Sequence, residues 1–171
     1  LPLDDLPTGI CGVCDADQDC VDAGTGIACS IDVMGMQTTC TNGGVGSFCQ
    51  SQAGCAEGLF CDDLIDGVAL LPKACGECST DADCPDDTRC TPSINVEQFS
   101  GNKFCAAPGS VANDGMCPVG GDNVCASGHC GLVDVGLFEV GVCGACKSDS
   151  DCPGTCMPGD FDDGFIGSVC V

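Results

Sequence analysis

The sequence predicts a small disulfide-rich fold, an elongated array of five four-cysteine β-hairpin modules with little helix. Three observations lead to this prediction. The chain has 21 cysteines in 171 residues, a density typical of disulfide scaffolds. The pattern C-G-x-C-x-x-D-x-D-C begins at Cys11, Cys75 and Cys143, and repeats at long intervals indicate an array of similar units. Trp and Tyr are absent and only seven Phe are present, so crosslinks rather than one large core must stabilise the chain.

The cysteines from Cys14 onward divide into five sets of four with the common spacing C-x5-C-x3–8-C-x10–14-C, except that the fourth set opens with x7. In C-G-x-C, the first cysteine closes one module and the second opens the next. We therefore assign an arm and junction to 1–13 and the five modules, in order, to 14–40, 49–75, 78–105, 117–143 and 146–170.

The long segment between the third and fourth cysteines of each set predicts a β-hairpin. Residues 64–69 place Asp66-Gly67 between apolar flanks, a strong signal for a two-residue turn. Residues 133–142 alternate with period two around Gly136-Leu137. The segments 99–104 and 161–165 have an apolar–turn–apolar order, and 30–39 shows it most weakly. The chain has 26 Gly, and its acidic residues are mostly Asp, which favours turns over helices.

Four cysteines can pair in three ways. We favour first-to-third and second-to-fourth, because crossed bridges tie the leading loop of a module to both hairpin strands. A bridge of the first type closes a loop worth about 3 kcal/mol in the chain-entropy model. The favoured pairs are Cys14–Cys29, Cys20–Cys40, Cys49–Cys61, Cys55–Cys75, Cys78–Cys90, Cys84–Cys105, Cys117–Cys130, Cys125–Cys143, Cys146–Cys156 and Cys152–Cys170.

The fourth set, C-x7-C-x4-C-x12-C, resembles the first four cysteines of EGF-like domains, which pair in the same crossed order. The resemblance covers the spacing only, because the last EGF cysteine pair has no counterpart at its usual place. The Asp-x-Asp-Cys-Pro repeats at 81–85 and 149–153 also resemble those of secreted multi-cysteine surface proteins. This likeness implies a secreted cysteine-rich repeat class and transfers no functional residue.

Cys11 is left over from the five sets. Three alternatives stay open for it: a partner in a cleaved upstream segment, a bond to another chain, or a free thiol. The ten residues before it contain two prolines, which favour extended geometry at the preceding positions. We expect this segment to act as an assembly arm through its apolar side chains, Leu1, Leu3, Leu6 and Ile10.

The charge of −22 comes from 26 acidic and 4 basic residues. Nucleic-acid binding needs clustered Lys and Arg, so this class of function is excluded. No apolar run approaches the ~20 residues of a membrane span. The many cysteines predict a secreted protein, extracellular or at the cell surface, where disulfides persist. The chain begins at Leu1 rather than Met, from which we expect that a leader has been removed.

Aspartates recur at the same places before the second cysteine of modules 1, 3 and 5. With Asp15, the first copy reads D-x-D-x-D, as in an EF-hand loop, but Cys20 replaces the required sixth-position Gly and no Glu stands at the twelfth, which excludes an EF-hand. Two interpretations remain: Asx turns, or a looser calcium site. Ca²⁺ is the one cofactor we consider, with none required, and its candidate ligands are Asp15, Asp17, Asp19, Asp81, Asp83, Asp149 and Asp151.

No catalytic constellation is recognisable. C-G-x-C occurs in thiol–disulfide oxidoreductases, but here it is repeated without a βαβ context and without a basic residue to stabilise a thiolate. Cys-x2-Cys pairs can bind zinc, yet the other spacings suit zinc poorly. His129 is the only histidine, and no nucleophile and acid partner it in the sequence. We therefore expect no enzyme.

The expected function is that of a secreted, non-enzymatic structural protein that assembles with copies of itself into an extracellular filament, surface appendage or matrix. Mean hydropathy is +0.25 despite the acidic residues, and exposed apolar surface usually marks an interface. The alternatives are a monomeric binding module (adhesion domain, toxin or protease inhibitor) using 91–104 or 106–116, and an acidic calcium-binding protein. Thr91-Pro92-Ser93 is a candidate for O-linked glycan.

Overall fold

The computed structural model describes residues 12–32, 35, 37–66, 68, 71–96, 98, 100–162 and 164–171. The predicted arm residues Leu1, Leu3, Leu6 and Ile10, together with Cys11, lie outside the described residues. The chain divides into two compact units, Leu1–Ser79 with Glu97–Lys103, and Thr80–Val96 with Phe104–Val171. Each unit is described by itself below.

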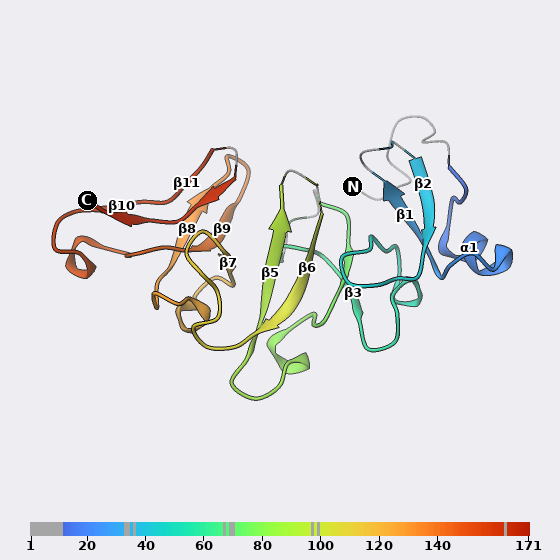
Figure 1. Ribbon diagram of the computed structural model, residues 1–171, viewed down its shortest axis with the longest axis horizontal. Coiled ribbons are helices and arrows are strands. Elements are labelled where there is room, and N and C mark those ends of the chain that lie inside the picture. The colour runs from blue at the N-terminus through green and yellow to red at the C-terminus, as the bar shows by residue number, and fades with distance from the viewer. Residues whose placement is uncertain are drawn as a thin grey trace. The chain divides into compact units, whose positions relative to one another are not determined.

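The first unit contains the only α-helix of the described residues, α1 (Asp17–Ala23), followed by the hairpin of β1 (Ala28–Asp32) and β2 (Gln37–Thr41). A 3-10 turn over Gln52–Gly54 leads to β3 (Phe60–Asp62), which pairs with β4 (Ala74–Gly76). Gly24 ends α1 in the left-handed region, with φ 65°, a conformation that glycine adopts without steric cost. Helix α1 therefore ends after 7 residues, within a mostly β chain (Figure 1).

The second unit repeats the same plan. The hairpin of β5 (Arg89–Asn95) and β6 (Ser100–Ala106) contains the boundary between the units. It is followed by a three-stranded sheet in the order β7-β9-β8, made of β7 (Met116–Cys117), β8 (Cys130–Asp134) and β9 (Glu139–Cys143). The last module holds two short ladders, β10 (Cys156–Met157) with β13 (Val169–Cys170) and β11 (Asp160–Phe161) with β12 (Phe165–Ile166). The predicted fold class is confirmed.

The disulfides join each leading loop to a hairpin. The third and fourth cysteines stand opposite each other on paired strands, as in Cys29↔Cys40 and Cys130↔Cys143, but each is bonded to a cysteine of the loop before the hairpin. This is the crossed order favoured from the sequence. It holds for Cys14–Cys29, Cys20–Cys40, Cys49–Cys61, Cys55–Cys75, Cys84–Cys105, Cys117–Cys130, Cys125–Cys143, Cys146–Cys156 and Cys152–Cys170; Cys78 and Cys90 are disulfide-bonded as well.

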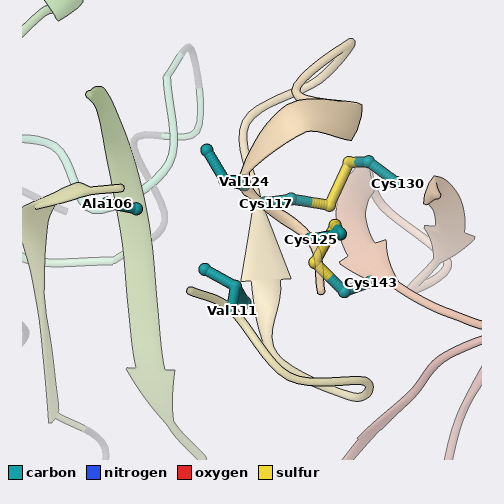
Figure 2. Close-up of a cluster of buried hydrophobic side chains, with 7 residues drawn as sticks. All are labelled: Ala106, Val111, Cys117, Val124, Cys125, Cys130 and Cys143. Carbon is teal, nitrogen blue, oxygen red and sulfur yellow. A yellow bond between two sulfur atoms is a disulfide. The ribbon is translucent and has the colours of Figure 1, made fainter. Parts of the chain in front are cut away.

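The cystines also form the interiors of the modules. In module 1 the buried cluster consists of cysteines alone. A cluster in the second unit adds Ala106, Val111 and Val124 to the cystines of module 4 (Figure 2). Among the described residues, the bulkiest fully buried side chains are valines. The modules are therefore stabilised by crosslinks with small apolar side chains packed around them.

Two predicted hairpin turns differ from the structure in different ways. The chain does turn between Ile65 and Val68, where Val68 N donates to Ile65 O at 3.1 Å, but the loop between the paired strands is longer than two residues, because β3 ends at Asp62 and β4 begins at Ala74. The turn predicted within 99–104 is wrong in position, since β6 begins at Ser100 and continues to Ala106. In module 2 the strands align so that Cys61 lies opposite Cys75. The turn signal is therefore correct in place, but the strand pairing begins four residues before the turn rather than directly beside it.

The glycine of C-G-x-C is required by close approach to the next hairpin. A Cβ atom added at Gly12, Gly76 or Gly144 would lie 1.8 Å from Thr38 Oγ1, 2.7 Å from Lys103 O or 2.2 Å from Ser168 Oγ, respectively. The residue after each glycine donates its N–H to the carbonyl of the same neighbour, at 3.1, 2.8 and 2.7 Å. The segment that enters a module therefore bonds to the outer edge of its second hairpin strand.

Candidate functional site

The first aspartate of each D-x-D repeat has a structural role. Its carboxylate accepts a hydrogen bond from the backbone N–H of the third cysteine of the same module. The distances are 2.9 Å from Cys29 N to Asp17 Oδ1, 2.9 Å from Cys90 N to Asp81 Oδ1 and 2.8 Å from Cys156 N to Asp149 Oδ1. This bond ties the leading loop to the start of the hairpin, in addition to the disulfides.

In the two modules that lack D-x-D, the side chain three residues before the second cysteine also accepts a hydrogen bond from the amide of the third cysteine. Cys61 N donates to Gln52 Oε1 at 3.1 Å, and Cys130 N donates to Asp122 Oδ1 at 2.8 Å. Sequence analysis missed both residues because it searched for the repeated motif. Counting three residues back from the second cysteine of every set finds all five acceptors.

The acceptor is needed because, among the described strands, none is paired with the outer side of the first hairpin strand. The second strand is covered there by the entering segment, whereas the third cysteine directs its N–H outward from the hairpin. An unpaired amide at a strand edge is open to pairing with other chains. The side chain three residues before the second cysteine satisfies this amide and shields the edge at that point.

The second aspartate of the repeat closes the turn before the helix or 3-10 turn. Asp19 Oδ2 accepts from the N–H groups of Asp15 and Ala16 at 2.7 and 2.9 Å. Asp151 Oδ2 accepts from Lys147 N and Ser148 N, both at 2.9 Å. These backbone donors lower the pKa of Asp19 and of Asp151 below the usual aspartate value. Asp83 accepts from Thr80 N at 2.8 Å in the same way.

The candidate calcium ligands therefore already accept hydrogen bonds from the protein, with six of the seven carboxylates used in this way. Within the described residues, the side chains close enough to share one metal ion are cysteines of each module rather than acidic groups. These cysteines are disulfide-bonded, whereas a cysteine that binds a metal ion must be a free thiolate. Calcium binding by the Asp-rich turns stays a prediction, testable by calorimetric titration.

Acid is expected to destabilise the modules through these aspartates. Because the folded-state pKa is lowered, each contributes stability that is present above the unfolded pKa of about 3.9 and lost as pH falls through the folded pKa. We expect the melting temperature to fall between about pH 4 and pH 2. Asp151→Asn keeps an acceptor oxygen without titrating, so it should reduce this fall. An equal fall in the variant would assign the acid sensitivity to other groups.

Lys103 is buried and forms ion pairs with two aspartates in the first unit. Its Nζ lies 3.0 Å from Asp62 Oδ2 and 2.5 Å from Asp66 Oδ1, and its side chain is 6 % exposed. Burial by itself lowers the pKa of Lys103, but the two carboxylates outweigh it and the pKa is raised. Ser79 Oγ donates to Asp62 at 2.7 Å. The cluster holds Asp66 in place within the turn that the sequence predicted.

The second unit has an apolar groove between modules 4 and 5. It has a volume of about 440 Å³ and is lined by Val119, Gly120, Cys130, Gly131, Leu132, Cys146, Lys147, Cys156, Pro158, Gly159 and Ser168. Val119 and Leu132 are exposed, and β11 lies beside β8 (Figure 1). Lys147 Nζ pairs with Asp122 Oδ2 at 3.0 Å. The hydrogen bond from Cys130 N, followed by that from Lys147, lowers the pKa of Asp122.

The segments predicted as departures from the repeat are part of the fold. Residues 91–104 belong largely to β5 and β6. In 106–116, Val111 is buried and bonds to the backbone of Val124 and Ala126 at 2.9 and 2.7 Å. Thr91 is fully buried and Ser93 is exposed, so Ser93 is the accessible hydroxyl of the predicted glycan site. His129 is half-buried, and its carbonyl accepts from Gly144 N at 3.0 Å.

No helix in the described part of the chain has the length and apolar character needed to cross a membrane. The disulfide-rich fold is of the extracellular type, compatible with a structural or a binding role. Comparison with protein-family models, with curated proteins and with solved structures yields no match to this chain.

Proposed function

We propose that this chain is a secreted, non-enzymatic structural protein whose disulfide-stapled modules self-assemble into an extracellular filament, surface appendage or matrix. One observation carries the proposal. Of the eleven large apolar side chains that are exposed in the described residues, eight lie in 119–171. They are Val119, Leu132, Leu137, Met157, Phe161, Ile166, Val169 and Val171.

Several of these side chains are neighbours on the last module. Met157 and Val169 stand opposite each other on β10 and β13, and they are 50 % and 46 % exposed. The rings of Phe161 and Phe165 lie 5.2 Å apart across β11 and β12. Apolar side chains concentrated on one module mark a contact surface, and contacts that do not close produce filaments.

Charge opposes this association. Each chain carries −22, and like charges repel over the Debye length of about 8 Å at physiological ionic strength. We therefore expect association to increase with salt, with divalent cations and at low pH. The same dependence separates apolar assembly, which salt promotes, from assembly driven by opposite charges, which salt weakens.

Sedimentation velocity of the full chain, with electron microscopy of the same samples, tests the proposal. We expect concentration-dependent association that the double variant Met157→Ser/Val169→Ser reduces. The matched control, Val13→Ser/Val21→Ser, changes two exposed valines of the first unit and should leave association unchanged. A single monomeric species at all concentrations and salt levels would contradict self-assembly and favour the alternative, a monomeric extracellular binding module.

A further inference from the structure

No described strand is paired with the outer edge of β8, although β11 lies beside this strand. It pairs with β9 in the register Gly131↔Val142 and Val133↔Val140, and Val135 N donates to Phe138 O at 3.0 Å to close the hairpin. Bonding groups alternate along an antiparallel strand, so the odd-numbered residues bond to β9. Leu132 therefore directs its N–H and C=O away from β9, on the side where no strand is paired with β8 in the described chain.

The equivalent edge is blocked in other modules. The position two residues after the third cysteine is Pro92 in module 3 and Pro158 in module 5, and proline has no N–H to offer an added strand. In module 2, β3 ends at Asp62, one residue after Cys61. In module 1 the position is Ile31, which is half-buried. Leu132 is 49 % exposed and keeps its N–H, so β8 has the accessible edge.

Residues of β8 line the groove between modules 4 and 5. Gly131 and Leu132 line it from module 4, and Pro158 and Gly159 line it from module 5. Lys147 also lines it, and Arg89 Nη1 lies 3.4 Å from the carbonyl of Gly120, another lining residue. Two of the four basic residues in the chain therefore lie at or beside the groove. Both already pair with an aspartate, Arg89 with Asp81 and Lys147 with Asp122, so they reduce the repulsion of an acidic apolar segment rather than offer it unpaired positive charge.

We infer that this groove accepts residues 1–10 of a second copy of the chain as a strand added to β8. This inference rests on the proposed self-assembly and names its acceptor. The segment carries Leu1, Leu3, Leu6 and Ile10 for the apolar walls and Asp4 and Asp5 for the basic side chains. Strand addition uses main-chain hydrogen bonds for affinity and side-chain pockets for specificity.

The proline positions set the register of the added strand. In Leu6-Pro7-Thr8-Gly9-Ile10, alternate residues face opposite edges. If Leu6, Thr8 and Ile10 bond to β8, Pro7 lies at a position that faces away, where its missing N–H has no effect. Thr8 then supplies the N–H at the centre of the contact, opposite Leu132.

A labelled peptide with the sequence of residues 1–10 tests this arrangement by fluorescence anisotropy, titrated with the full chain at a concentration where the chain is monomeric. We expect the Thr8→Pro peptide to bind at least tenfold more weakly than the parent peptide. The Gly9→Pro peptide should bind like the parent, because residue 9 faces away from β8. Equal binding of all three peptides, or no binding of the parent, would overturn the inference.

Leu132→Pro in the full chain provides the second arm of the test. It copies the residue found at the equivalent position in modules 3 and 5, and Leu137→Ala, at an 80 % exposed site, is its control. We expect Leu132→Pro alone to lower both peptide binding and self-association. If the wild-type chain associates and Leu132→Pro does so equally, the acceptor is wrong and self-assembly stands. If the wild-type chain stays monomeric, self-assembly is wrong, and the peptide titrations still decide whether the groove binds this segment.

Discussion

Removing the Cys125–Cys143 bridge by a double substitution to alanine is expected to lower the free energy of unfolding of module 4 by about 4 kcal/mol, within the 2–5 kcal/mol typical of small secreted domains. Two effects add. The bridge spans 18 residues, so its loss returns about 3 kcal/mol of chain entropy to the unfolded state. Both cysteines are also buried in the cluster with Val111 and Val124, so the truncation leaves a cavity.

The Cys152–Cys170 bridge is the matched control, because it also spans 18 residues. Cys170 is exposed and Cys152 half-buried, so its removal should cost the entropy contribution with little packing loss. Hydrogen exchange followed by mass spectrometry, read separately on peptides from modules 4 and 5, measures both. Equal losses of unfolding free energy in the two variants would show that the buried cluster adds nothing to the bridge. Negligible losses in both would contradict stabilisation by crosslinks.

Asp122→Ala is expected to destabilise the start of β8 by about 1–3 kcal/mol, the cost of leaving a partly buried amide without its acceptor. Asp122 Oδ1 accepts from Cys130 N at 2.8 Å, and its carboxylate also pairs with Lys147. Asp122→Asn keeps an acceptor for the amide and loses the exposed ion pair, which is worth about 0–1 kcal/mol. We therefore expect Asn to retain most of the stability.

Hydrogen exchange of the Cys130 amide distinguishes the two contributions. The exchange rate should rise by about tenfold or more in Asp122→Ala and change little in Asp122→Asn. Asp86→Ala removes one exposed negative charge elsewhere and serves as a charge control. Similar rates in Asp122→Ala and the wild type would show that the acceptor three residues before the second cysteine is dispensable.

Module 2 shows what could not be predicted from local pattern. Asp66-Gly67 is a strong turn signal, and the chain turns there, but the signal did not reveal that the strands pair as Cys61↔Cys75 beyond a longer loop, or that Asp66 bonds to the buried Lys103. The pairing register depends on which sulfurs can meet, and the ion pair depends on a residue 37 positions away. Neither can be read from the residues around the turn.

The D-x-D repeat shows a similar limit at the candidate site. Sequence analysis left open whether these aspartates form turns or bind calcium, and the structure uses their carboxylates for backbone amides. It also adds Gln52 and Asp122 in the same role. The shared feature is a position relative to the second cysteine, and the residue type varies because either an amide or a carboxylate oxygen can accept the bond.

The order and spacing of the cysteines alone determined the sets of four, the C-G-x-C junctions and the hairpins between third and fourth cysteines. These follow from the sequence because a chain with so few large apolar residues must be held by covalent bridges, and bridge spacing is a linear property. Only the tertiary structure decided where the chain turns, which amides need side-chain acceptors and which strand edge stays open beside the groove. Those features depend on which backbone N–H and C=O groups have no partner strand, and the sequence alone does not show which strands pair.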